Sequence, residues 1–172
     1  MSVMIGQTGE PLSKSLTVSW HKTPAGMMRA RWTGDRLFEL KFITPSSSEA
    51  DAGARVQSDS GLQLDDCLTE YFKTGRDCFS NIRLNEEGWT EFTARVYACC
   101  RTIGPGETST YKELARLAGS PNAFRAVGAA MARNRILLII PCHRVLASDG
   151  KLTGFNAPGG TDVKRFLLDL ES

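Results

Sequence analysis

The chain has 172 residues, of which 41% are hydrophobic and 23% are charged, and its formal net charge is +2. These values are ordinary for a globular protein that buries a core as one large domain or two small ones. The sequence also excludes a membrane-spanning chain, because no apolar stretch approaches the ~20 residues that a bilayer requires.

The sequence begins without the basic and then apolar pattern of a secretory signal. We therefore expect a cytoplasmic protein, associated with the nucleoid in a bacterium or nuclear in a eukaryote. The five cysteines are odd in number and lack the spacing of a disulfide framework, which favours free thiols. Only two histidines are present and there is no C-x-x-C, so we expect no metal site.

Basic residues are unevenly distributed along the chain. Up to Thr90 there are ten basic and twelve acidic residues, whereas from Glu91 onward there are eleven and seven. Between Arg101 and Val145, seven Lys and Arg residues are accompanied by only two glutamates. Such a segment favours a polyanionic partner, although a solvated helix face would give the same count.

Three β-strands are predicted over residues 16–43. The segments "LTVSW", "MMRARW" and "LFELKFI" are joined by the turns "TPAG" and "TGDR", which is typical of a β-meander. Residues 44–61 are small and polar and predict an exposed connection. In the third strand, the residues Leu37, Glu39 and Lys41 alternate with Phe38, Leu40 and Phe42.

A helix is predicted over residues 62–75, with Gly75 as its stop. The segment "NEEGW" at 85–89 then marks a boundary, so we expect two domains, 1–88 and 89–172. The apolar stripe of the first helix consists of Leu64, Cys67, Leu68, Tyr71 and Phe72. The second domain opens with helical spacing of Phe92, Val96, Cys99 and Cys100.

Two short helices joined by a Gly-containing turn are predicted next, which is the pattern of a helix-turn-helix. Thr110 and Glu113 form a capping box at the start of the first helix. Gly119 ends this helix, and we expect Ser120 and Pro121 as the N-cap and first residue of the second.

The second of these helices is rich in small residues around Arg125. A glycine in a helix costs about 1 kcal/mol relative to alanine, so a close approach must favour it. The neighbour is either another helix or a nucleic-acid backbone, and the basic balance of the segment favours DNA. The small residues are Ala123, Ala126, Gly128, Ala129, Ala130 and Ala132.

A last helix is predicted from Thr161, its N-cap, with an apolar stripe on which Glu171 also falls. A carboxylate that points toward a core needs a partner, whereas an acid at a frayed chain end needs none. The stripe consists of Val163, Phe166, Leu167 and Leu170.

The stretch "LLIIPCHRV" places Cys142 and His143 directly after an apolar run, 136–140. Lowering a cysteine pKa from ~8.5 by about two units, roughly 2.7 kcal/mol, makes most of the thiol anionic. An imidazole held by a buried carboxylate supplies such stabilisation, and only Cys142, His143 and Glu171 could build this set. Adjacent strand residues face opposite sides, so His143 needs a turn, which Pro141 favours, or a bridging water. The alternative is a buried structural cysteine at an ordinary strand end.

The segments "GETSTYKELARLAG", "FRAVGAAMARN", "IIPCHRV", "GKLTGF" and "KRFLLDLE" follow one another in the second half of the chain. In this order they resemble the O6-alkylguanine-DNA alkyltransferases, also called methylated-DNA–protein-cysteine methyltransferases, and the strong similarity covers about Phe92 to Glu171. A weaker similarity, "TPAG…GDRLFELKF" and "LTEYFKTGR", covers the amino-terminal half. The resemblance implies an α+β fold, with a ribonuclease-H-like amino-terminal α/β domain and a helical carboxy-terminal domain that contains a helix-turn-helix.

The resemblance also implies a chemistry, namely DNA repair by direct reversal. The alkyl group of O6-alkylguanine, or of O4-alkylthymine, in double-stranded DNA would pass irreversibly to Cys142. The protein would bind the minor groove as a monomer, flip the damaged base out of the helix and act once. No cofactor and no membrane would take part.

Roles for individual residues follow from the same resemblance. Cys142 would accept the alkyl group, His143 would take its proton through a water, and Glu171 would orient the imidazole. Asn134 would support the active-site turn, and Tyr111 would donate a hydrogen bond as the guanine leaves.

Arg125 would fill the stack that the flipped base vacates. The other implied DNA-binding residues are Ala123, Phe124, Ala126, Gly128, Thr93, Lys112, Ser120 and Ser148. The implied base pocket consists of Pro141, Val145, Phe155 and Asn156.

The chain departs from the family pattern at a few positions. Phe155 stands where tyrosine is usual, and "NAPGG" after it is longer than the common spacing. Asn134 is followed by Arg135 where proline is usual. Phe124 replaces a small residue and would wedge against the duplex.

Three other classes of protein share part of this pattern. Lesion binders that resemble this fold replace the acceptor cysteine, whereas "PCHRV" retains it. Regulatory relatives carry an extra amino-terminal metal-binding cysteine segment, which is not seen in this sequence. A thiol hydrolase would use a similar Cys-His pair but would leave the basic, alanine-rich helix unexplained.

Overall fold

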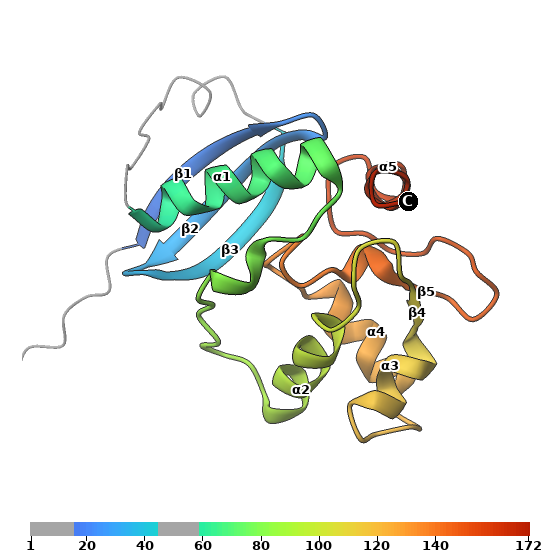
Figure 1. The fold of residues 1–172 in the computed structure, drawn as a ribbon. Helices are drawn as coiled ribbons and strands as arrows, with labels where there is room; N and C mark the ends of the chain where they lie inside the picture. The colour runs from blue at the N-terminus through green and yellow to red at the C-terminus, as the bar shows by residue number, and fades with distance from the viewer. Residues whose placement is uncertain (1–15, 45–58) are drawn as a thin grey trace, which may run out of the picture.

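The three predicted strands form one antiparallel sheet in the computed structural model, which describes residues 16–44 and 59–172 (Figure 1). The order in the sheet is β1-β2-β3, so β2 is central. The strands are β1 (Leu16–Thr23), β2 (Gly26–Thr33) and β3 (Arg36–Ile43).

The simple alternation predicted for β3 is wrong, because the strand contains a β-bulge. Arg31 of β2 pairs with Glu39, but the next residue, Trp32, pairs with Leu37. Phe38 is therefore an extra residue without a partner in the ladder. The bulge brings Leu37 to the buried face, where it is fully covered.

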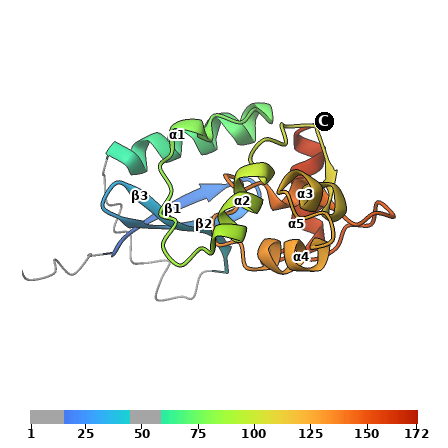
Figure 2. The same cartoon turned by 90° about the horizontal axis from the view of Figure 1, so that it is seen from below.

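Helix α1 (Asp59–Thr74) lies across one face of the sheet (Figure 2). It starts before the predicted position, so residues 59–61 belong to the helix and not to the exposed connection. The rest of that connection, 45–58, lies outside the described residues. The predicted stop is confirmed, because Gly75 has φ +70° and its N–H donates to the carbonyl of Tyr71.

The second half of the chain is mainly helical, as predicted, and the whole chain has a mixed α/β fold (Figure 1). Two short strands in this half pair in parallel. The elements are α2 (Glu91–Cys100), β4 (Ser109–Thr110), α3 (Tyr111–Leu117), α4 (Phe124–Ala132), β5 (Val145–Leu146) and α5 (Thr161–Leu170).

The capping box of α3 is half confirmed. Thr110 Oγ1 accepts from the Glu113 N–H at 3.0 Å, as an N-cap should. The Glu113 carboxylate, however, pairs with Arg116 at 2.7 Å.

The predicted start of α4 is wrong by three residues. The helix begins at Phe124 with Ala123 as its N-cap residue. The Ser120 N–H donates to Ala115 at the end of α3, and the Ser120 carbonyl accepts from Ala123. Ser120 therefore completes the preceding helix and the turn instead of starting the next helix.

Helix α5 also differs from its predicted face. Gly160, not Thr161, is the N-cap residue. Phe166, expected on the apolar stripe, is 40% exposed, whereas Lys164 is fully buried beside Leu167. The buried face thus contains the cation Lys164, which the pattern of hydrophobic residues does not predict.

The apolar run 136–140 is a coil of tight turns and not a strand. Ile140 N–H donates to Ile136 O at 3.0 Å, and Cys142 N–H donates to Ile140 O at 2.7 Å. Leu138 is buried and has φ +68°, a conformation that costs a non-glycine residue about 1–2 kcal/mol. The surrounding core holds the turn in this conformation.

The outer edge of β3 joins the two halves of the chain. The Leu40 N–H donates to Arg135 O, and the Leu137 N–H donates to Leu40 O, both at 2.8 Å. The sheet therefore holds the segment that leads from α4 to the turn before Cys142. In the described part of the chain, no helix combines the length and apolarity needed to cross a membrane.

Gly75→Ala should destabilise the protein more than Gly34→Ala does. Both glycines have positive φ, which costs alanine about 1 kcal/mol or more. At Gly34 no atom lies within 4 Å of an added Cβ, whereas at Gly75 the Cβ would lie 2.4 Å from the Leu170 carbonyl oxygen. We expect a loss on the order of 3 kcal/mol for Gly75→Ala in urea unfolding. Equal losses for the two variants would contradict the close approach of α1 and α5.

Candidate active site

Cys142 begins a short 3₁₀ turn, η2 (Cys142–Arg144), that follows the buried coil 136–140. The residue is only 6% exposed. Burial raises the pKa of the Cys142 thiol, and a hydrogen bond from Asn134 and the charge of Lys164 only partly offset this effect. Because its pKa is raised, the thiol is protonated at neutral pH, whereas the anionic sulfur considered from the sequence requires a lowered pKa.

Asn134 lies just after α4, is buried and stabilises the coil 136–140 that precedes Cys142. Its Nδ2 donates to the carbonyl of Ile140 at 2.8 Å and lies 3.3 Å from the sulfur of Cys142. Its Oδ1 accepts from the N–H of Ile136 at 2.9 Å. One amide thus fixes both ends of the coil and contacts the thiol.

His143 is held by Glu171, which is 28 residues away in the sequence. The imidazole Nε2 donates to Glu171 Oε1 at 2.8 Å, and both side chains are fully buried. Burial lowers the pKa of His143 more than the bond to Glu171 raises it, so the imidazole is neutral at neutral pH. Nδ1 is buried and has no hydrogen-bond partner among the described residues. With the proton on Nε2, Nδ1 carries a free lone pair that can accept a proton.

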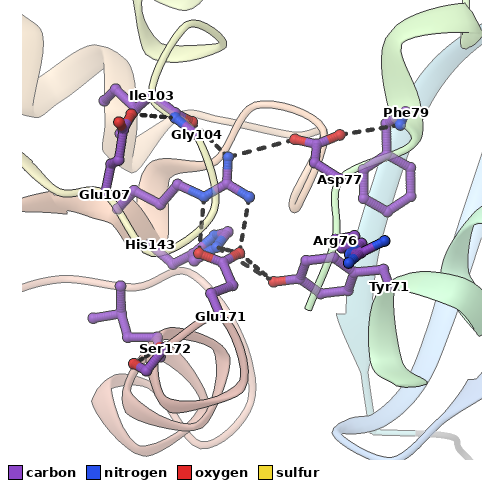
Figure 3. Close-up of polar contacts among 12 residues, drawn as sticks. Tyr71, Arg76, Asp77, Phe79, Ile103, Gly104, Glu107, His143, Glu171 and Ser172 are labelled. Atoms are coloured by element: carbon purple, nitrogen blue, oxygen red, sulfur yellow. Dashed lines mark hydrogen bonds and ion pairs between the residues drawn. The ribbon is translucent and has the colours of Figure 1, made fainter. Parts of the chain in front are cut away.

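Glu171 is the centre of a buried charge network (Figure 3). Arg144 donates Nε to Oε2 at 2.9 Å and Nη2 to Oε1 at 2.8 Å, and the Tyr71 hydroxyl donates to Oε1 at 2.6 Å. Burial alone would raise the pKa of Glu171, but the hydrogen bonds from His143 and Arg144 outweigh it and lower the pKa to about 2. Glu171 is therefore a permanent anion behind the imidazole.

Arg144 extends this network to two other segments. Its guanidinium is buried, and Nη1 donates to the carbonyl of Ile103 at 2.6 Å and lies 3.4 Å from Asp77 Oδ2. Sequence reasoning assigned no site role to Arg144 or Tyr71. The available signal was a tyrosine on an apolar helix stripe, because a buried hydroxyl needs a partner.

Lys164 is a third residue that the sequence analysis missed. Its ammonium is buried and donates to the carbonyls of Val145 at 2.7 Å and Thr153 at 3.1 Å. Burial lowers the pKa of Lys164, and the nearby Cys142 acts in the opposite direction. The signal in the sequence was the spacing from Lys164 to Leu167 and Glu171, which places all three on one face of α5.

The implied pocket residues are only partly brought together. Pro141 and Val145 flank η2 and are buried. Phe155 is buried, with its ring edge-on to His143 at 6.5 Å between centroids. Asn156 is exposed. In residues 16–44 and 59–172, no group of three or more His, Cys, Asp and Glu side chains could hold a metal ion.

The first turn of helix α4 is exposed. Phe124, Arg125 and Ala126 are exposed, and the guanidinium of Arg125 lies 5.9 Å from the Phe124 ring centroid. At Gly128 an added Cβ would make only an ordinary contact, 4.0 Å from the Tyr111 ring. Packing within the chain therefore does not require glycine at this position.

The remaining implied DNA-binding residues lie in four separate segments: α2, α3, the α3–α4 turn and the loop after β5. Lys112 and Ser148 are exposed, and Ser120 is half-buried in the α3–α4 turn. Thr93 lies in the first turn of α2, where its N–H donates to the N-cap hydroxyl of Thr90. Ser148 borders a hollow of about 380 Å³ beside β4 and β5.

Comparison with known proteins defines the class. Residues 91–172 match the family model of the DNA-binding domain of 6-O-methylguanine DNA methyltransferase. The fold is similar to that of Mycobacterium tuberculosis O6-methylguanine methyltransferase, with a TM-score of 0.74 and 34% identity over 90% of this chain and 93% of that chain. The chain belongs to the O6-methylguanine-DNA methyltransferase family.

Curated relatives from different organisms share the name methylated-DNA–protein-cysteine methyltransferase. A methylated-DNA–protein-cysteine methyltransferase of Haemophilus influenzae is 52% identical over 59% of this chain and 55% of its own length. One of Methanosarcina barkeri is 50% identical over 60% of this chain and 63% of its own length. The chain thus spans less than two thirds of these curated relatives. The M. tuberculosis enzyme in complex with DNA is similar with a TM-score of 0.72 and 34% identity, over 90% of this chain and 92% of that one.

The buried Glu171 carboxylate should make the protein sensitive to acid. Its pKa of about 2 lies below the ordinary 4.5, so its stabilising contribution is present above about pH 4.5 and is lost as the pH falls toward 2. We expect Glu171→Gln to be less stable at pH 7 and to lose less free energy of unfolding on acidification, by on the order of 3 kcal/mol. Urea unfolding at several pH values measures this difference.

Glu113→Gln is the matched control. Glu113 is an exposed carboxylate paired with Arg116, and solvent screens such a pair. The pH dependence of this variant should follow that of the parent protein. Parallel curves for Glu171→Gln and the parent would contradict the buried charge network.

Proposed function

We propose that this protein repairs DNA by moving the alkyl group of O6-alkylguanine to Cys142. One observation carries the proposal. The buried thiol of Cys142 contacts Asn134 and is followed directly by the neutral imidazole of His143. Glu171 binds Nε2 of this imidazole, and Nδ1 has no hydrogen-bond partner among the described residues. The names of the relatives, methylated-DNA–protein-cysteine methyltransferases, support the same reaction.

His143 acts as the base in the proposed reaction. No direct hydrogen bond joins Cys142 and His143 in the described residues, so the thiol proton passes through one water to Nδ1. The imidazolium that forms is stabilised by Glu171, because the pKa of that carboxyl is held at about 2 and the group stays ionised. Asn134 and Lys164 stabilise the thiolate, since both lower the pKa of Cys142.

The thiolate then attacks the alkyl carbon in line with the C–O6 bond. A C–S bond forms, the C–O bond breaks, and its electron pair stays with the guanine. The proton that left the thiol returns to the guanine, with Tyr111 donating a hydrogen bond as the base leaves. The product, S-alkylcysteine, has no side chain nearby that could reverse the step, so each molecule acts once. The same geometry accepts O4-alkylthymine.

Helices α3 and α4 supply the DNA-binding surface as a helix-turn-helix, with α4 in the minor groove. Two observations support this. Packing within the chain does not require Gly128, so close approach to DNA explains it. The exposed Arg125 and Phe124 lie at the start of the helix, where Arg125 replaces the flipped base and Phe124 wedges beside it.

Other contacts complete the proposed complex. Thr93, Lys112, Ser120 and Ser148 contact the DNA backbone, and Ala123 and Ala126 let α4 approach it. The flipped base is enclosed by the pocket residues Pro141, Val145, Phe155 and Asn156. The protein acts as a monomer with a ribonuclease-H-like domain, 1–88, and a catalytic domain, 89–172.

Incubation with duplex DNA that contains one O6-methylguanine tests the reaction. Intact-protein mass spectrometry should find one added methylene mass, with a stoichiometry of one, and peptide mapping should place it on Cys142. Cys142→Ala should gain none, whereas Cys99→Ala should react like the parent protein. Repeated turnover, or modification of a different cysteine, would overturn the proposal.

Arg125→Ala should slow methyl transfer in duplex DNA by about tenfold or more, because the vacated stack is left open. In a single-stranded oligonucleotide the base needs no flipping, so the difference should shrink. Arg165→Ala removes an exposed cation from α5 and serves as the control for net charge. An equal loss on both substrates would show that Arg125 contributes charge only.

A further inference from the structure

Arg135 connects the active-site turn to the amino-terminal sheet. Its Nε donates to the carbonyl of Phe38 at 2.9 Å, and its Nη2 donates to the carbonyls of Asn85 at 3.1 Å and Glu87 at 2.7 Å. The guanidinium also lies 4.2 Å from the ring centroid of Phe38 and 5.9 Å from that of Trp89. One side chain thus contacts β3 and the segment that joins the two halves of the chain.

The β-bulge explains why β3 offers a partner to Arg135. Phe38 is the extra residue between Glu39 and Leu37, and its carbonyl accepts from Arg135 Nε. The forked, planar guanidinium can bind this carbonyl and stack on the same residue's ring, which an ammonium cannot do. The β-bulge therefore provides the carbonyl and the ring of Phe38 that the Arg135 guanidinium binds.

Arg135 is also adjacent in the chain to the amide that contacts the thiol. Its own carbonyl accepts from the Leu40 N–H at 2.8 Å, and Asn134 precedes it directly. The side chain and backbone of Arg135 thus attach Asn134 to β3 from two directions. Any rotation of this peptide would move Asn134 Nδ2 away from the sulfur of Cys142, now 3.3 Å distant.

We propose that Arg135 is a positioning residue for Cys142, which acts by fixing Asn134 against the bulge at Phe38. The role in repair depends on the proposed methyl transfer. The role in thiol reactivity does not, because it concerns only the contact between Asn134 and the sulfur.

The first test measures thiol reactivity without DNA. The rate at which iodoacetamide alkylates Cys142 is followed against pH by peptide mass spectrometry in the parent, Arg135→Ala and Arg135→Lys. Loss of the Asn134 hydrogen bond removes a contact that lowers the pKa of Cys142, so the midpoint for Arg135→Ala should shift to higher pH. Arg135→Lys should fall between the two, because an ammonium keeps a cation near Phe38 but cannot replace the fork.

The second test measures single-turnover methyl transfer at saturating duplex DNA. We expect the rate of Arg135→Ala to fall about tenfold while the Kd for DNA changes less than about twofold, because the Arg135 side chain binds the carbonyls of Phe38, Asn85 and Glu87. Arg83→Ala, which removes an exposed arginine paired with Asp35, should leave both values unchanged.

The outcomes separate the two proposals. Unchanged midpoint and unchanged transfer rate, with only a lower melting temperature, would overturn the positioning role of Arg135. No transfer by the parent protein would overturn the proposed function, while the midpoint of iodoacetamide alkylation would still decide the role of Arg135. If Arg135→Ala does not fold, Arg135→Lys provides the same comparison.

Discussion

The carboxylate of Glu171 is the constraint on which the site depends. A buried anion is costly unless every oxygen is paired, and Glu171 receives hydrogen bonds from His143, Arg144 and Tyr71. These donors come from η2 and from α1, while the acceptor ends α5. The hydrogen bond that orients the imidazole therefore lies where these three elements meet. The amino-terminal half is therefore part of the candidate site through Tyr71, although Cys142 lies in the other half.

Local patterns predicted most of the elements and indicated Cys142 and His143 as a candidate pair. The strands, the stop at Gly75 and the N-cap Thr110 each depend on a few neighbouring residues, and the structure has them. Cys142, His143 and Glu171 could be proposed together because few residues of suitable chemistry exist in the chain. The bulge at Phe38 could not be found this way, since it depends on pairing between strands.

The missed residues share one cause. Lys164 and Tyr71 are polar residues within hydrophobic faces, and Arg144 was considered only as one of the basic residues between Arg101 and Val145. Their partners are backbone carbonyls and a carboxylate that are distant in the sequence. The neutral resting state of Cys142 was missed for a related reason, because burial depends on the tertiary fold and outweighs the neighbouring polar groups.

The burial of Cys142 also limits the reaction of its sulfur with small molecules in solution. Soluble oxidants and small electrophiles react with thiolates far faster than with thiols, and they need access to the sulfur. A protonated sulfur that is 6% exposed is shielded from both kinds of attack. In the proposed reaction the acceptor is consumed, and such shielding would then preserve the unreacted pool of protein until a lesion arrives.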